Sequence, residues 1–177
     1  MGVLGKHNAM NALAAAGAAW MLGVPGEATA KGLAAFHGAQ RRMEYKGRFN
    51  GADVYDDYAH HPDELAATID AVRTMGYQRM ILVFQPHTYT RTKALFDDFV
   101  RELRRADVVV LAEIYAARER NTVGISSMDM ISHIPGSTYR ETLPEVTAHL
   151  RQIAQPGDVI LTVGAGDIYR AGEALLK

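Results

Sequence analysis

Short apolar runs that alternate with segments of helical spacing constrain the fold of this chain more than any other feature. The runs 79–84, 107–112 and 158–163 are almost wholly apolar after a charged first residue, which is typical of strands covered on both faces. Between them, apolar residues recur with a helical period, as in 93–104. This alternation predicts an α/β fold with a mainly parallel sheet and flanking helices.

A β-hairpin is expected ahead of the alternating region. Asn50-Gly51 is a strong turn signal, and the flanking segments Met43–Phe49 and Ala52–Tyr55 have the composition of strands. The helices expected after this hairpin are 63–74, 93–104, 126–132, 144–154 and 167–176.

The first part of the chain has a different character. Residues 8–22 are rich in alanine and contain no proline, so they favour a helix. A second helix is expected over 27–35, and Gly38 is expected to end the helical region. We therefore divide the chain into a helical segment, residues 1–38, and a sheet domain, residues 39–177.

The composition excludes several classes of protein. With 19 basic and 20 acidic residues the formal net charge is -1, which gives no bulk electrostatic reason to bind nucleic acid or a membrane. The absence of cysteine excludes disulfides and thiolate zinc sites. The apolar runs are too short to span a bilayer, and no signal peptide opens the chain. A cytosolic protein without nucleic-acid or membrane partners is expected.

Three polar clusters, 56–62, 85–91 and 164–167, each follow a strand-like run and precede a helix. In parallel sheets, ligands bind beyond the carboxyl ends of the strands, so the clusters mark one candidate site. In the first cluster, Asp57 is suited to accept hydrogen bonds from sugar hydroxyls. A cap of the next helix by Asp56 or Asp57 explains the same residues equally well.

The second cluster offers Arg91, whose guanidinium grips a carboxylate or phosphate through parallel hydrogen bonds, although a surface position explains it equally well. The third cluster, with Gly164 and Gly166, permits close approach of the backbone. It lacks the third glycine of a dinucleotide fingerprint, because position 169 is tyrosine. The chain also has no GxxxxGK[ST] phosphate loop, so a complete ATP site within it is not expected.

Two further features of the sequence are open to more than one reading. Arg41-Arg42 lies between the two predicted parts, where an arginine can reach a phosphate or be an ordinary surface residue. Asn8 and Asn11 share one helix face and can pair with an adenine edge, unless Asn8 caps the helix. A zinc site from His60, His61 and His87 is disfavoured, because their spacing matches no ligand pattern.

Five segments together resemble the Mur ligase family. GKHNAMNALAA (5–15) and FHGAQRRME (36–44) are similar to the junction between the central and C-terminal domains of these enzymes. DDYAHHP (56–62), FQPHTYTRT (84–92) and GAGDI (164–168) are similar to the L-alanine-adding members. The segments follow in the family's order, and the resemblance extends over essentially the whole chain.

The resemblance implies a Rossmann-like C-terminal domain preceded by a helical remnant of a central ATPase domain. It also implies a ligase that uses ATP and Mg²⁺ to join L-alanine to UDP-N-acetylmuramate through an acyl phosphate. The phosphate loop and the magnesium ligands of the family lie in N-terminal and central domains that this chain lacks. The fragment is therefore expected to be inactive alone and to hold no metal.

The resemblance further implies a role for individual residues. In the nucleotide site, Asp57 would hold the ribose, and Arg42 would act as the catalytic residue on the transferred phosphate. Both side chains are expected at solvent-facing positions. The adenine would meet His7, Asn8 and Asn11, and the amino acid and sugar substrate would meet His60, His87, Tyr89 and Arg91.

One departure and three alternatives remain. Thr88 stands where the family usually has arginine, so one charge that grips the substrate is absent or replaced, for instance by Arg91 alone. The murein tripeptide-recycling ligase is similar in the same segments. A free-standing nucleotide-binding module and a histidine-based metal hydrolase are the alternatives from other classes.

Overall fold

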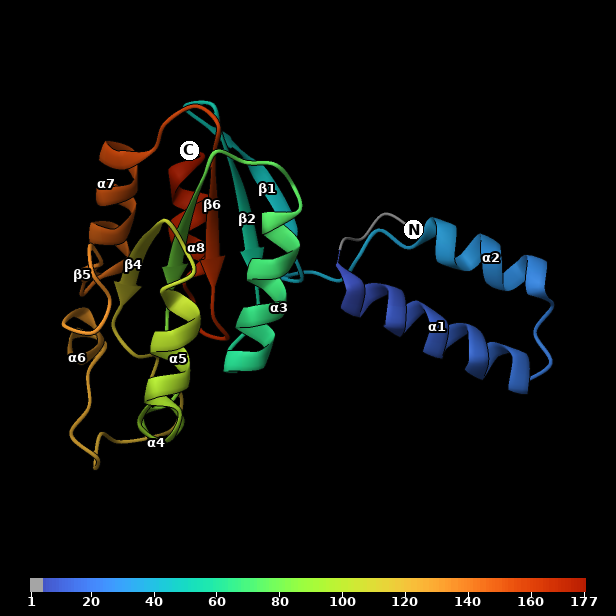
Figure 1. The fold of residues 1–177 in the computed structure, drawn as a ribbon, viewed down its shortest axis with the longest axis horizontal. Helices are drawn as coiled ribbons and strands as arrows, with labels where there is room; N and C mark the ends of the chain where they lie inside the picture. The colour runs from blue at the N-terminus through green and yellow to red at the C-terminus, as the bar shows by residue number, and fades with distance from the viewer. Residues whose placement is uncertain (1–4) are drawn as a thin grey trace.

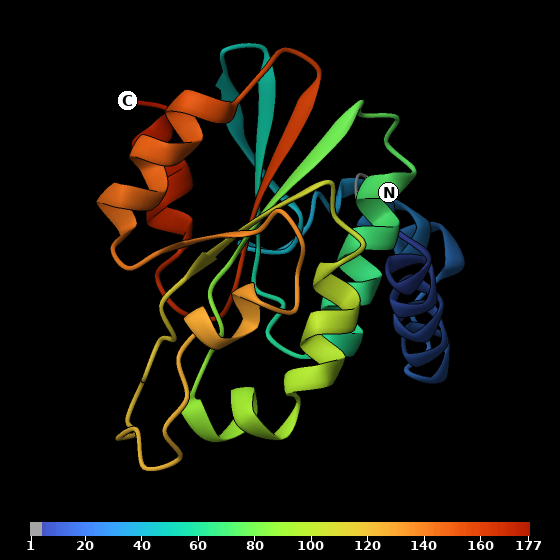
Figure 2. The same cartoon turned by 60° about the vertical axis from the view of Figure 1, so that its left-hand side comes forward.

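The computed structural model describes residues 5–177, without the side chains of Lys6 and His7. A six-stranded sheet lies between two layers of helices (Figure 2). The strands follow the order β1-β2-β6-β3-β4-β5 across the sheet. Their bounds are β1 Glu44–Phe49, β2 Ala52–Asp57, β3 Arg79–Phe84, β4 Val108–Ala112, β5 Thr138–Arg140 and β6 Asp158–Val163.

The sheet is mainly parallel, as the alternating pattern predicted. Only the hairpin partner β1 runs antiparallel, against β2, and all other neighbouring pairs are parallel. The predicted turn joins β1 to β2, with Asn50 at φ 47° and Gly51 at φ 79°. Because β6 lies between β2 and β3, the carboxyl ends of these three parallel strands lie side by side. The polar residues that follow them are therefore close together.

The core explains why the inner strands read as continuous apolar runs. Along β3, Met80, Leu82 and Phe84 point into one apolar cluster, while Ile81 and Val83 point into the other. The first cluster packs under α3 and α5, and the second under α7 and α8. Both faces of the sheet are therefore buried.

The helices differ from the sequence prediction at two places. The single helix expected over 93–104 is wrong, because the backbone leaves the helical region at Leu95 (φ −113°, ψ 22°). A short α4 at the rim is thereby separated from α5, which packs on the core. The expected helix 126–132 is reduced to α6. The helices are α1 Lys6–Met21, α2 Gly26–Ala35, α3 Pro62–Arg73, α4 Tyr89–Ala94, α5 Phe96–Leu103, α6 Met128–Ile131, α7 Leu143–Ile153 and α8 Tyr169–Leu175.

Helices α1 and α2 form a hairpin that projects away from the sheet (Figure 1). Several large apolar side chains of this hairpin are exposed, including Trp20 (80%) and Leu13 (67%). Within residues 5–177, no helix combines the length and hydropathy that crossing a bilayer requires.

The ion pair between Arg79 and Asp158 supports the amino end of the central strands. Asp158 is 3% exposed and accepts from Arg79 Nε and Nη2 at 3.0 and 2.7 Å. We expect Arg79→Ala to lower the free energy of unfolding by about 3 kcal/mol or more, since it leaves a buried carboxylate without its cation.

Arg48→Ala is the matched control for this prediction. Arg48 also pairs with an aspartate, Asp53, but its side chain is 63% exposed. Its loss should cost less than about 1 kcal/mol. Urea denaturation of both variants measures the difference, and equal losses would contradict the prediction.

Candidate functional site

The linker between the helical hairpin and the sheet is held by the side chain of Arg41. Its Nε donates to Asp56 Oδ2 at 2.9 Å, and its two terminal nitrogens donate to the carbonyls of Gly166 (3.0 Å) and Gly164 (2.6 Å). The guanidinium also lies over the rings of Tyr58 and Tyr169. Arg41 therefore ties the linker to β2 and to the loop after β6.

The two glycines of the loop 164–167 are required by close packing. A Cβ at Gly164 would lie 2.6 Å from the carbonyl oxygen of Gln85, and Gly164 has φ 149°. The Gln85 side chain accepts from the backbone N–H groups of Asp167 and Ile168 and donates to Asp167 Oδ1. The predicted close approach of this loop's backbone is therefore a contact within the chain. The loop packs against Gln85, the first residue of the polar cluster 85–91.

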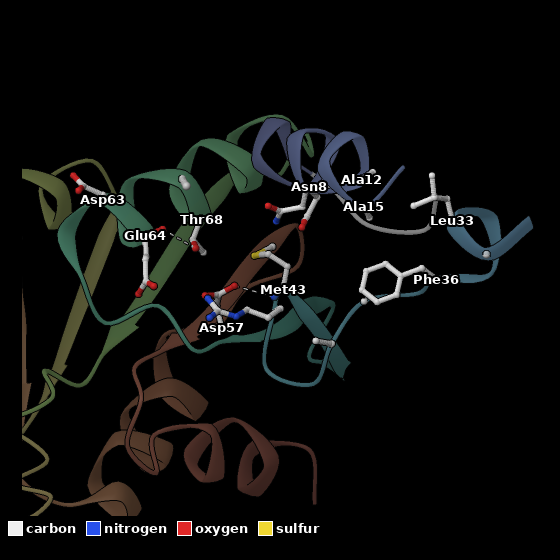
Figure 3. A pocket seen from close by; sticks show the side chains of 16 residues that line it. Asn8, Ala12, Ala15, Leu33, Phe36, Met43, Asp57, Asp63, Glu64 and Thr68 are labelled. Atoms are coloured by element: carbon white, nitrogen blue, oxygen red, sulfur yellow. Dashed lines mark hydrogen bonds between the residues drawn. The ribbon is translucent and has the colours of Figure 1, made fainter. Parts of the chain in front are cut away.

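A cavity of about 780 Å³ lies between α1, the linker and α3 (Figure 3). Asn8, Asn11, Arg42 and Asp57 all line it, so the structure gathers residues that the sequence places on a helix, a linker and a strand. The other lining residues are Ala12, Ala15, Gly32, Leu33, Phe36, Gly38, Ala39, Met43, Asp63, Glu64, Ala67 and Thr68.

The two asparagines share the cavity face of α1, as their spacing predicted. The N-cap of α1 is Gly5 rather than Asn8, so the alternative of capping by Asn8 is wrong. His7 belongs to α1, but its side chain lies outside the described part of the structure. Arg42 is exposed and lies over the Tyr58 ring at 5.8 Å.

The expectation that the Asp57 side chain faces solvent is wrong. Asp57 is the last residue of β2 and is 4% exposed. Its Oδ2 accepts from Met43 N at 2.9 Å and its Oδ1 from Ala59 N at 2.8 Å. Burial raises the pKa of Asp57, although these two hydrogen bonds and the charge of Arg42 oppose the shift. The carboxylate thus supports the linker and also reaches the cavity.

The alternative in which Asp56 or Asp57 caps the next helix is also wrong. The N-cap of α3 is His61, whose side chain accepts from Asp63 N, and Glu64 accepts from the N-cap backbone. Asp56 instead accepts from Arg41 and from the hydroxyl of Thr162 at 2.7 Å. Burial raises the pKa of Asp56 against both hydrogen bonds.

The rings of His60 and His87 lie close to each other. Their ring centroids are 6.0 Å apart. His60 Nδ1 lies 2.9 Å from the carbonyl of Tyr58, and a carbonyl only accepts, so this nitrogen carries the proton. Burial lowers the pKa of His87, and the charges of Arg91 and His60 lower it further.

The remaining residues of this cluster lie on α4, which begins beside His87. Tyr89 is its first residue and Arg91 lies in the next positions, both partly buried. Thr88 precedes them at φ 70°, a conformation that β-branched residues rarely adopt. Among the described residues, His87 Nδ1 and Arg91 Nη1 are buried and have no hydrogen-bond partner.

The described residues contain no group of three or more His, Asp or Glu side chains that could hold a metal ion. Sequence reasoning missed three polar residues of the cavity wall, Asp63, Glu64 and Thr68. It also missed Tyr115, whose ring stacks on His87 at 5.6 Å. The available signal for Tyr115 was its place directly after a strand-like run.

Comparisons with known proteins show the family to which the chain is similar. A family model described as "Mur ligase, glutamate ligase domain" matches residues 41–166. The UDP-N-acetylmuramate–L-alanine ligase of Lachnospira eligens is 48% identical over all of this chain, which covers 39% of that protein.

Solved structures give the same result. The UDP-N-acetylmuramate–alanine ligase of Thermotoga maritima matches with a TM-score of 0.79 and 27% identity, over 98% of this chain and 38% of that one. A murein peptide ligase of Psychrobacter arcticus matches with a TM-score of 0.68 and 25% identity, over 97% of this chain and 36% of that one.

The chain therefore belongs to the Mur ligase family. Its relatives at 41–48% identity are UDP-N-acetylmuramate–L-alanine ligases, and it matches their C-terminal portion. The resemblance and the fold class predicted from the sequence are confirmed. The chain spans about 39% of the length of these relatives.

Asp57→Ala should destabilise the chain. The substitution leaves two backbone N–H groups without their acceptor, each at a cost of about 1–3 kcal/mol. We expect the free energy of unfolding to fall by about 2–6 kcal/mol.

Asp63→Ala is the matched control, because Asp63 lines the same cavity but its side chain is 91% exposed. Its loss should cost less than about 1 kcal/mol. Thermal and urea melts compare the two variants. A stable Asp57→Ala variant would show that this carboxylate does not support the linker.

Proposed function

We propose that this chain is the nucleotide-closing part of an ATP-dependent ligase that joins L-alanine to UDP-N-acetylmuramate through an acyl phosphate. In this proposal residues 1–38 are the helical end of the central ATP-binding domain, and 39–177 form the C-terminal domain. The protein would act in the cytoplasm, in peptidoglycan synthesis. The family relationship and the relatives' names support the proposal.

One observation carries the nucleotide side of the proposal. Asn8, Asn11, Arg42 and Asp57 come from three different elements and line one cavity of about 780 Å³, within the usual size of a small-molecule site. The two amides suit an adenine edge, since each offers a donor and an acceptor. Asp57 already accepts two hydrogen bonds, but a carboxylate has about four acceptor positions, so ribose hydroxyls can still bind.

The unpartnered groups near His87 support the substrate side. His87 Nδ1 and Arg91 Nη1 are buried without partners among the described residues, and buried polar groups normally have one. A carboxylate or phosphate oxygen of the substrate would satisfy Arg91. We assign His60, His87, Tyr89 and Arg91 to the amino acid and the sugar substrate.

Arg42 is the proposed catalytic residue. It is exposed at the cavity, and it follows Arg41, which is fixed to the sheet domain. In the assembled enzyme its guanidinium would contact the phosphate being transferred, where charge develops in the transition state. Mg²⁺ would neutralise phosphate charge when bound. Its ligands would come mainly from the rest of the protein, because the described residues offer no metal cluster.

The full-length protein tests the assignment directly. ADP release should require both UDP-N-acetylmuramate and L-alanine. Turnover with a murein tripeptide in place of L-alanine would instead favour the recycling ligase. No turnover with either acceptor would refute the proposed function.

The 177-residue chain alone should not hydrolyse ATP. It has no GxxxxGK[ST] loop, and that loop normally supplies the backbone donors and the lysine that bind the phosphates. A coupled ADP assay with ATP, Mg²⁺ and both substrates should stay at background. Robust turnover by the chain alone would contradict this prediction.

Arg42→Ala in the full-length protein should reduce kcat on the order of 100-fold or more, because the contact is expected to strengthen in the transition state. Arg48→Ala is the control. Arg48 is an exposed arginine of strand β1, and its guanidinium pairs with Asp53. Steady-state kinetics measure both variants. An unchanged kcat for Arg42→Ala would remove Arg42 from the catalytic machinery.

A further inference from the structure

Tyr115 lies just beyond the end of β4, in the loop that follows Glu113. Its backbone holds the segment around His87 from both sides. Tyr115 N donates to the Pro86 carbonyl at 2.8 Å, and Thr88 N donates to the Tyr115 carbonyl at 2.9 Å. This forms a parallel bridge between His87 and Tyr115. The bridge extends the parallel pairing of β3 and β4 beyond the ends of both strands.

The side chain of Tyr115 lies between His87 and the glycine loop. Its ring stacks on the imidazole, with centroids 5.6 Å apart and planes inclined by 20°. A Cβ at Gly166 would lie 2.6 Å from Tyr115 Cγ, so the base of the tyrosine side chain packs directly against that glycine. The carbonyl of Gly166 in turn accepts from Arg41.

The start of this loop is fixed by Glu113. Its Oε1 accepts from Ile114 N at 2.7 Å, and its Oε2 accepts from Ser126 Oγ and from Tyr139 OH, both at 2.7 Å. Burial acts to raise the pKa of Glu113, but these hydrogen bonds outweigh it and lower the pKa. The segment that carries Tyr115 is therefore held by hydrogen bonds at its start.

We propose that Tyr115 is a positioning residue that holds the His87 imidazole in place and connects it, through Gly166, to the linker residue Arg41. A role of His87 toward substrate rests on the proposed function, whereas the positioning itself does not. The ring covers one face of the imidazole, so it also limits contact of His87 with water. A flat ring is required for this, and the hydroxyl is not.

The charged groups around His87 come from three elements. Arg91 approaches from α4, His60 from the loop after β2, and Glu119 from the loop that carries Tyr115. Glu119 also accepts from Thr90 N at 3.0 Å. Removal of the Tyr115 ring leaves these groups in place and exposes the imidazole. The pKa of His87 should then rise toward its ordinary value, since burial is the main cause of its lowering.

The test follows the histidine rings of the ¹⁵N-labelled 177-residue chain by NMR across pH, with His87→Gln to assign His87. In Tyr115→Leu, His87 ring protons should move downfield because the ring current is lost, and the pKa of His87 should rise. Tyr115→Phe should retain the wild-type values. Tyr45→Leu, at an exposed tyrosine whose ring makes an edge-to-face contact with Tyr55, should leave His87 unchanged.

Several outcomes would overturn the proposal. One is a folded Tyr115→Leu protein with wild-type His87 shifts and pKa, and another is a Phe variant that behaves like Leu. The wild type gives a further measurement if Tyr115→Leu fails to fold. Nuclear Overhauser effects between the Tyr115 and His87 rings should be present, and their absence would refute the contact.

The full-length protein separates this proposal from the proposed function. Tyr115→Leu should lower kcat/KM for the UDP-sugar by about tenfold or more without changing the KM for ATP, and Tyr115→Phe should restore it. A wild-type protein without ligase activity would refute the proposed function and leave the NMR result standing. Equal kcat/KM for wild type and Tyr115→Leu would refute the positioning role in catalysis.

Discussion

The guanidinium of Arg41 is the interaction on which the rest of the site depends. It joins the linker, the buried carboxylate of Asp56 and two carbonyls of the loop after β6. A lysine could not make these contacts together, because they use the planar fork of arginine. Since Asp56 is fully buried, loss of this cation would leave a carboxylate in the core whose one remaining hydrogen-bond donor among residues 5–177 is the Thr162 hydroxyl. Together with the hydrogen bond from Met43 N to Asp57, this side chain fixes the linker to the sheet.

Most of the fold could be predicted from the pattern of apolar residues. The runs that became β3, β4 and β6 predicted a buried parallel sheet, and Asn50-Gly51 predicted its hairpin. β5 has only three residues, all partly exposed, so it leaves no apolar run to detect. The break at Leu95 could not be predicted, because the apolar stripe of 93–104 continues through it. Its cause is tertiary packing, since α4 lies beside the candidate site and α5 packs on the core.

The site was predictable in its location and less so in the roles of neighbours. Three clusters after strand ends indicated one edge of the sheet, and the cavity and the His60–His87 contact lie there. The residues alone could not show that Arg41 is bound to the sheet, or that Asp57 is buried, because both depend on contacts with distant segments. The hydrogen bonds separate the residues that support the structure from those that are available to a ligand. Asp56 and Asp57 have protein partners, whereas His87 Nδ1 and Arg91 Nη1 have none among the described residues.

The linker contacts also determine which walls of the cavity belong together. Residues 41–43 are tied to the sheet through Arg41 and the Met43 N–H, whereas Asn8 and Asn11 belong to the projecting helical hairpin. The cavity is thus shared between two bodies joined upstream of Arg41, near Gly38. A ligand that contacts both parts would bind only when they lie together. Part of its binding free energy would therefore stabilise that arrangement. Under the proposed function, the affinity for the nucleotide would therefore also depend on how strongly the two parts are held together.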